Sequence, residues 1–211
     1  YYKSGPATSN ASKERIVAID KNKIVGTDIF DIWGKYFIHG NYIDGSKRAT
    51  EDNWSFGVAN QFHSSYGTIL PSTIDKIRVS KEHNISDNVK THKPQDAYQR
   101  VLQHAGASYK RDQVDIRVID EVQNGKYTYK GSKGSTLGII DSQNDVGGFP
   151  ILQSGTYPTN LSGDGIADHW KIHKKLDPNK YQATGKDLSS AYDNIEVYLH
   201  DLVDDIIKKQ Q

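Results

Sequence analysis

The segment 160–170, NLSGDGIADHW, carries oxygen-bearing side chains in a pattern that suits a metal ion. Asn160, Ser162 and Asp164 alternate along it and a glycine follows, as at the start of an EF-hand calcium loop. The twelfth position of such a loop is normally a bidentate glutamate, but here it is Lys171.

Two interpretations of this loop are open. In the first, Asn160, Asp164 and Asp168 are ligands of an accessory calcium ion, with Ser162 adding a neutral oxygen. Calcium takes roughly six to eight oxygens, several of them from carboxylates, and only Asp164 and Asp168 supply carboxylates. In the second, Ser162 or Asp164 caps a helix that starts near Asp164, and the acids face the positive end of its dipole. The residues by themselves favour the cap.

Two histidines in the same region have the spacing of zinc ligands. His169 and His173 are four positions apart on the expected helix, but the glutamate that a metalloprotease would carry after the first histidine is missing. We therefore predict surface histidines. A separate stretch, DSQNDVGG, combines Asp141, Asn144 and Asp145 with paired glycines, which predicts a specific turn with a structural role.

Composition excludes several classes of protein. The 211 residues contain 35 % hydrophobic and 25 % charged residues, and no apolar run is long enough to span a bilayer. The formal net charge of +1 provides no field for recruiting nucleic acid or an anionic membrane. Cysteine is absent, so thiol catalysis and thiolate metal sites are excluded.

The hydrophobic period changes along the chain. Residues 15–20 (RIVAID) and 35–43 (KYFIHGNYI) read as strands, and no helical period appears before about residue 94. Helices are predicted after Pro94, over residues 111–125, from about Asp164, and over residues 194–209. Four Asn-x-Ser/Thr sequons are present, at Asn10, Asn53, Asn84 and Asn160.

Several stretches in a fixed order resemble one family. They are YYKSGPAT, KYFIHGNYIDG with TEDNW, DAYQRVLQHAGAS, RDQVDIRVIDEVQNG, GIIDSQNDVGGFP, GDGIADHW, LDPN and YDNIEVYLHDLV. Together they resemble the C-terminal half of bacterial and fungal pectate lyases of polysaccharide lyase family 1. The resemblance covers nearly the whole chain.

The resemblance implies a mainly β fold. Residues 1–70 would be the last coils of a right-handed parallel β-helix, and residues 71–211 a helical and loop-rich extension packed on it. It also implies a secreted enzyme that cleaves polygalacturonate by calcium-dependent β-elimination with an arginine as base. The alternative is a non-catalytic carbohydrate-binding or structural module.

The family's calcium-binding acids and its Arg-x-Pro-x-x-Arg segment are expected upstream of this chain. None of the chain's arginines is set in that segment, so no catalytic residue is assigned and the main calcium site is expected elsewhere. Relatives often read Asp-x-Asp-Gly-Asp-Gly where this chain has Asn160 and Ser162. The expected partners are polygalacturonate and the N-terminal β-helix half of the same protein, which would cover an open end of this chain; neither nucleic acid nor membrane is expected.

Overall fold

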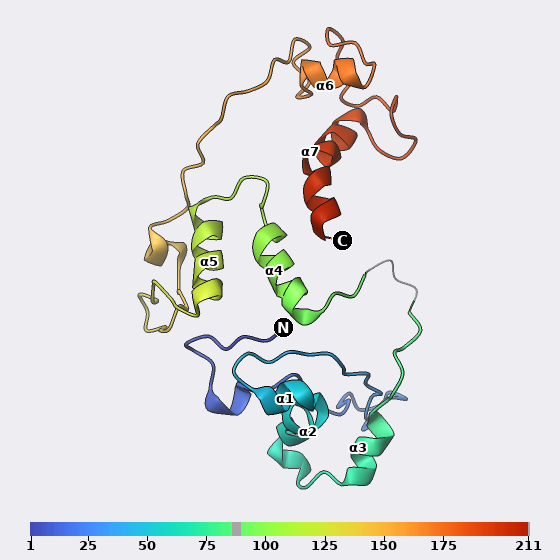
Figure 1. Cartoon of the computed structure of the whole chain (residues 1–211), viewed down its shortest axis with the longest axis vertical. Helices are drawn as coiled ribbons and strands as arrows, with labels where there is room; N and C mark the ends of the chain where they lie inside the picture. The colour runs from blue at the N-terminus through green and yellow to red at the C-terminus, as the bar shows by residue number, and fades with distance from the viewer. Residues whose placement is uncertain (86–89, 211) are drawn as a thin grey trace. The chain divides into compact units, whose positions relative to one another are not determined.

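The computed structural model describes residues 1–85 and 90–210, and its regular elements are helical (Figure 1). The α-helices are α1 (Lys47–Glu51), α2 (Asn53–Gly57), α3 (Pro71–Ile77), α4 (Pro94–His104), α5 (Gln113–Asn124), α6 (Asp168–His173) and α7 (Asn194–Gln210). Short 3-10 turns occur at η1 (Asn10–Ser12), η2 (Ala59–Gln61), η3 (Ser64–Tyr66) and η4 (Gln143–Val146).

The expectation of a mainly β chain, with residues 1–70 as coils of a right-handed parallel β-helix, is wrong. No strand or sheet forms within residues 1–85 and 90–210. Bridging between extended segments there is limited to two isolated parallel bridges, Tyr2 with Ile43 and Tyr36 with Arg78. The division of the chain into residues 1–70 and 71–211 stays a prediction.

The two segments that read as strands bond to helix ends instead of to neighbouring strands. The Ile16 N–H donates to the carbonyl of Gly57 at 2.9 Å, and the Tyr36 N–H donates to the carbonyl of Ile77 at 2.8 Å. An alternating apolar pattern only requires burial along one side. A non-helical segment lying on short helices meets that requirement as well as a strand does.

The absence of helices before residue 94 was also predicted wrongly, because α1, α2 and α3 lie there. Their start signals are local. The Ser46 side chain accepts a hydrogen bond from the Ala49 N–H at 3.3 Å, and the Asp52 side chain accepts one from the Ser55 N–H at 2.9 Å. Pro71 opens α3 at its first position. These helices are too short to show an apolar period.

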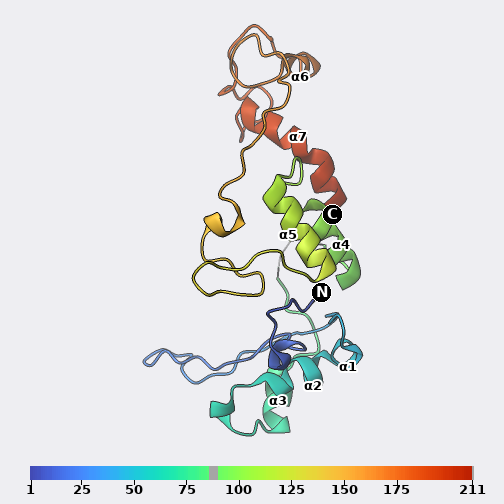
Figure 2. The ribbon, with the colours of Figure 1, turned by 90° about the vertical axis from the view of Figure 1, so that its left-hand side faces the viewer.

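The chain divides into two compact units. The first comprises Tyr1–Leu102 and Arg117–Phe149. Its core is a cluster of four buried residues, two of which come from α2 and α3. The helices α1, α2 and α3 lie close together in both views (Figures 1 and 2). The buried residues are Ile19, Trp54, Val58 and Ile77, with partly buried neighbours that include Val17, Tyr36 and Ile38 from the two segments that read as strands.

The second unit comprises Gln103–Ile116 and Pro150–Gln211. Its core joins α6 to α7 through an edge-to-face contact between Trp170 and Tyr198, with ring centroids 5.1 Å apart. The Trp170 indole N–H also donates to Asp201 on α7 at 3.0 Å. The buried members of this core are Ile166, Ala167, Trp170, Leu176, Ala183 and Tyr198.

Three of the predicted helices are confirmed as α4, α5 and α7. Gly106 and Gly125 follow α4 and α5 with φ angles of 71° and 61°, the left-handed conformation expected of glycines that end helices. The helix predicted from about Asp164 begins later, at Asp168. Ile166 and Ala167 therefore enter the core from a loop rather than from a helix.

Candidate functional site

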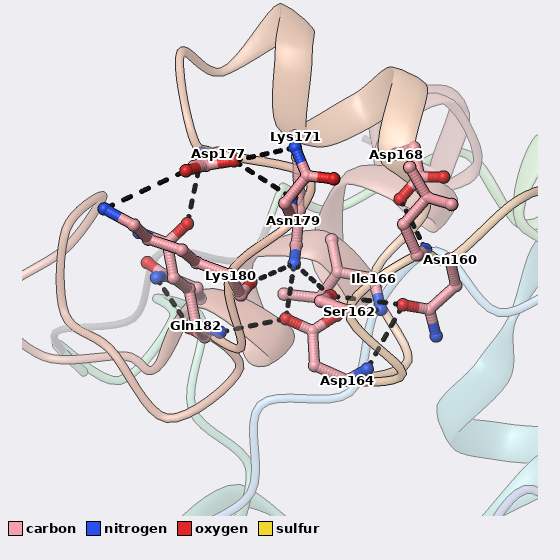
Figure 3. A network of polar contacts seen from close by, with 12 residues as sticks. Asn160, Ser162, Asp164, Ile166, Asp168, Lys171, Asp177, Asn179, Lys180 and Gln182 are labelled. Atoms are coloured by element: carbon pink, nitrogen blue, oxygen red, sulfur yellow. Dashed lines mark hydrogen bonds and ion pairs between the residues drawn. The ribbon is translucent and has the colours of Figure 1, made fainter.

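The loop that resembles a calcium site is folded tightly around its own polar groups (Figure 3). The Asn160 side-chain oxygen accepts a hydrogen bond from the Asp164 N–H at 3.1 Å, and the Asp164 carboxylate accepts one from the Ile166 N–H at 3.1 Å. Gly165 adopts a φ of 85°, which makes the turn that a calcium loop places at its sixth position. Backbone and side chains together thus reproduce the beginning of such a loop.

The ammonium group of Lys171 lies among these oxygens. Its Nζ donates to Asp164 Oδ2 at 2.5 Å, to Ser162 Oγ at 2.7 Å and to the Lys180 carbonyl at 2.8 Å (Figure 3). The side chains of Lys171 and Asp164 both have 0 % exposed surface. Because an ammonium has three N–H donors, the three contacts satisfy it completely.

The Asp164 carboxylate is the counter-charge. Besides Lys171 and the Ile166 N–H, it accepts a hydrogen bond from the Gln182 N–H at 3.0 Å. Burial raises the pKa of Asp164, but the hydrogen bonds from Gln182, Lys171 and Ile166 outweigh burial and lower the pKa to about 2. Asp164 is therefore ionised at neutral pH and forms a charge-neutral buried pair with Lys171.

Asp168 closes the loop from its far end. Its carboxylate accepts a hydrogen bond from the Leu161 N–H at 2.9 Å, and its own backbone N–H donates to the Thr159 carbonyl at 2.8 Å. Asp168 is buried in the first turn of α6, where an acid meets the positive end of the helix dipole as predicted. The structure thus brings Asn160 and Asp164 together and gives Asp168 a separate backbone partner.

The predicted helix cap is wrong. The residue before α6 is Ala167, and no side chain accepts a capping hydrogen bond there. The two expected capping side chains have other partners. Ser162 accepts a hydrogen bond from Lys171, and Asp164 accepts hydrogen bonds from Lys171 and from the Gln182 N–H. Sequence reasoning missed the role of Lys171, although a lysine at the twelfth position of a calcium-type loop was the available signal.

The other expected sites are structural. His169 and His173 are exposed, as predicted. The predicted turn at residues 141–148 is confirmed as η4, closed by a capping box between Ser142 and Asp145. Among the residues that the structure describes, no three histidine, aspartate or glutamate side chains come together to hold a metal ion.

One of the four sequons is buried. Asn53 is 8 % exposed, and its amide nitrogen donates to the carbonyls of Ala49 at 2.7 Å and Asn41 at 2.9 Å. Its side-chain oxygen accepts a hydrogen bond from the Asn41 N–H at 2.9 Å. A glycan on this nitrogen would break these contacts, so Asn53 serves the packing of the first unit.

The first unit also contains a small hollow of about 210 Å³ beside α1 and α2. Arg78 and His39 contribute cationic and imidazole groups to its lining, and the Arg78 guanidinium lies 5.5 Å from the ring centroid of Trp54. Its polar lining further includes Thr50, Glu51, Asp52 and Asn53.

The sequence is similar to curated proteins named probable pectate lyase C. The protein from Emericella nidulans is 29 % identical over 203 residues, which cover 96 % of this chain and 41 % of that relative. Those from Neosartorya fischeri and Aspergillus fumigatus are 32 % and 31 % identical over 167 residues, which cover 79 % of this chain and 35 % of each relative. The chain is related to pectate lyases.

The resemblance to pectate lyases predicted from the sequence is thereby confirmed. The chain spans about two fifths of the length of the pectate lyase relatives it matches. No protein-family model and no solved structure gives a significant match. None of the helices formed by residues 1–85 and 90–210 is long and apolar enough to cross a membrane.

Proposed function

We propose that the chain is part of a secreted pectate lyase that cleaves polygalacturonate by calcium-dependent β-elimination. We propose further that the residues performing the reaction lie in a part of the protein outside this chain. The observation that carries the proposal is the similarity to relatives named probable pectate lyase C along 79–96 % of the chain. The match covers only 35–41 % of those relatives, which supports the proposal that the reacting residues lie outside this chain.

The proposed reaction requires a base and a means of neutralising charge. A base removes the proton next to the uronate carboxylate, and the glycosidic oxygen then leaves. When bound, calcium neutralises the carboxylate and so makes that proton more acidic. In this chain, Arg48 is paired with Glu14 at 2.6 Å and Arg117 with Glu121 at 3.2 Å. Both of these arginines are held in ion pairs.

The direct test compares this chain with the longer protein that the proposal implies. Each would be incubated with polygalacturonate, and the unsaturated products would be followed by their ultraviolet absorbance. We expect release of unsaturated uronides by the longer protein in calcium, none in a chelator, and none from the 211-residue chain alone. Absence of products from the longer protein, or products from this chain alone, would contradict the proposal. Detection of the protein in the culture medium would test secretion.

The second candidate is a non-catalytic carbohydrate-binding module, and the hollow beside α1 and α2 is the observation that favours it. The Arg78 guanidinium there suits a bidentate pair with the carboxylate of a single uronate residue, although Glu51 and Asp52 in the same lining oppose its negative charge. Binding of oligogalacturonate to this chain, measured by calorimetry, should weaken at least about tenfold in Arg78→Ala. Arg15→Ala is the matched control, because Arg15 lies outside the lining. Equal binding of oligogalacturonate by both variants would exclude this hollow as the binding site.

A further inference from the structure

We propose that the Lys171 ammonium is the resident cation of the loop 160–171 and takes the place of the accessory calcium ion that the loop pattern suggests. The lysine stands at the position where a calcium loop carries its bidentate glutamate. Its Nζ lies 2.5–2.8 Å from three oxygens, two of which belong to the third and fifth positions of the loop, Ser162 and Asp164. This inference does not depend on the proposed function.

The donor set does not fit calcium. A calcium site supplies roughly six to eight oxygens and excess negative charge. Here the Asp164 carboxylate is already neutralised by Lys171, and one oxygen of the Asp168 carboxylate accepts a hydrogen bond from the Leu161 N–H. A divalent ion placed among the same oxygens would lie next to a buried positive charge, and the repulsion would be strong because no solvent screens it.

The lysine performs the structural task that a bound ion performs in such loops. Through Nζ it connects α6 to the loop at Ser162 and Asp164 and to the Lys180 carbonyl farther along the chain. The Gln182 N–H bonds to the same carboxylate oxygen, so the segment at residues 180–182 is held at two points. Because the cation is covalently attached, this part of the second unit is ordered at any calcium concentration.

The test is local hydrogen exchange, measured by mass spectrometry on peptides that cover residues 160–182. The 211-residue chain would be compared in chelator, in calcium and in magnesium as an ionic control. We expect equal protection in all three conditions for the unmodified chain. Protection that rises in calcium but not in magnesium, at the amides of Asp164 and Gln182, would overturn the proposal.

Two substitutions of the lysine separate its charge from its bulk. Lys171→Met keeps the aliphatic stem and removes the charge, so we expect exchange of these peptides to be at least about tenfold faster and indifferent to calcium. Wild-type protection in this variant would also overturn the proposal.

Lys171→Glu restores the calcium-loop residue at the twelfth position. We expect this variant to exchange fast in chelator and to regain protection in calcium, because the new glutamate joins Asp164 as a carboxylate ligand and no buried ammonium then repels the ion. Such a gain would show that the lysine and the ion are alternatives at one site. If Lys171→Glu stays unprotected in both conditions, the glutamate does not form a calcium site. The proposal is then decided by the exchange rates of the unmodified chain and of Lys171→Met.

Discussion

Lys171 Nζ lies 2.5 Å from Asp164 Oδ2, and neither side chain has any exposed surface. Two opposite charges taken out of water cost several kcal/mol of desolvation each, which their attraction offsets only when every remaining donor and acceptor is satisfied. Ser162, the Lys180 carbonyl and the Gln182 N–H provide those partners. The pair therefore makes the second unit sensitive to the loss of either charge.

Asp164→Ala should destabilise the second unit by about 3–5 kcal/mol, because it leaves the Lys171 ammonium buried without a counter-charge. The measurement is the free energy of unfolding from urea denaturation. Asp177→Ala is the control. The Asp177 side chain is 41 % exposed and its Oδ2 lies 3.8 Å from Lys180 Nζ, so we expect a loss of stability of less than about 1 kcal/mol. The apolar double variant Asp164→Leu with Lys171→Met should recover much of the stability. Equal losses in Asp164→Ala and Asp177→Ala would refute the role of the pair.

Lowering the pH should destabilise the second unit over a defined pH range. The pKa of Asp164 in the folded chain is about 2, below the ordinary value of 3.8. Its contribution is therefore fully present above about pH 4 and is lost as the pH falls towards 2, in total about 2 kcal/mol. The charged group in direct contact with Asp164 is Lys171.

Other carboxylates contribute to acid unfolding as well, among them Asp201, whose pKa is lowered by hydrogen bonds from Lys174 and Trp170. The informative quantity is thus the difference between the chain and Asp164→Asn. Between pH 4 and 2 the free energy of unfolding should fall less steeply in the variant. Parallel slopes would show that Asp164 does not carry a lowered pKa.

Asn53→Ala should cost about 2–3 kcal/mol of stability in the first unit, because it leaves the Asn41 N–H and the Ala49 carbonyl without their buried partner. Asn10→Ala is the control, since Asn10 is an exposed sequon residue. Thermal unfolding by circular dichroism would measure both. In a glycosylating host, mass spectrometry should find no glycan at Asn53, and a glycan there would contradict its burial.

Gly125→Ala should destabilise the end of α5 by about 1 kcal/mol, because a φ of 61° is unfavourable for a residue with a Cβ atom. Gly125→Asn should cost less, since asparagine tolerates this conformation better. The nearest heavy atom to the added Cβ would be Lys3 Cε at 3.9 Å, so no steric clash adds to the loss. Equal effects of alanine and asparagine in urea unfolding would argue against this explanation.

The relationship to pectate lyases, the helices α4, α5 and α7, and the turn at residues 141–148 were all predictable from the sequence. The relationship rests on the order of short motifs along the chain. The helices and the turn rest on local information: a 3.6-residue apolar period, glycines that end helices, or side chains that cap a turn within a few residues. The alternating patterns at residues 15–20 and 35–43 also correctly predicted that these segments contribute buried apolar side chains. Their assignment as β-helix strands failed because the partner of an extended segment is a long-range choice, and here short helices take that place.

The same distinction applies to the candidate site. The sequence determined that Asn160, Ser162 and Asp164 would present oxygens around a turn at Gly165, and that a lysine would replace the expected glutamate. Only the tertiary structure decided what the lysine does. Its ammonium is satisfied by a carbonyl of residue 180, and its counter-ion is held by the N–H of residue 182, both outside the loop pattern. A buried charge is stable only when all such partners are present, and their arrangement comes from packing rather than from spacing along the chain.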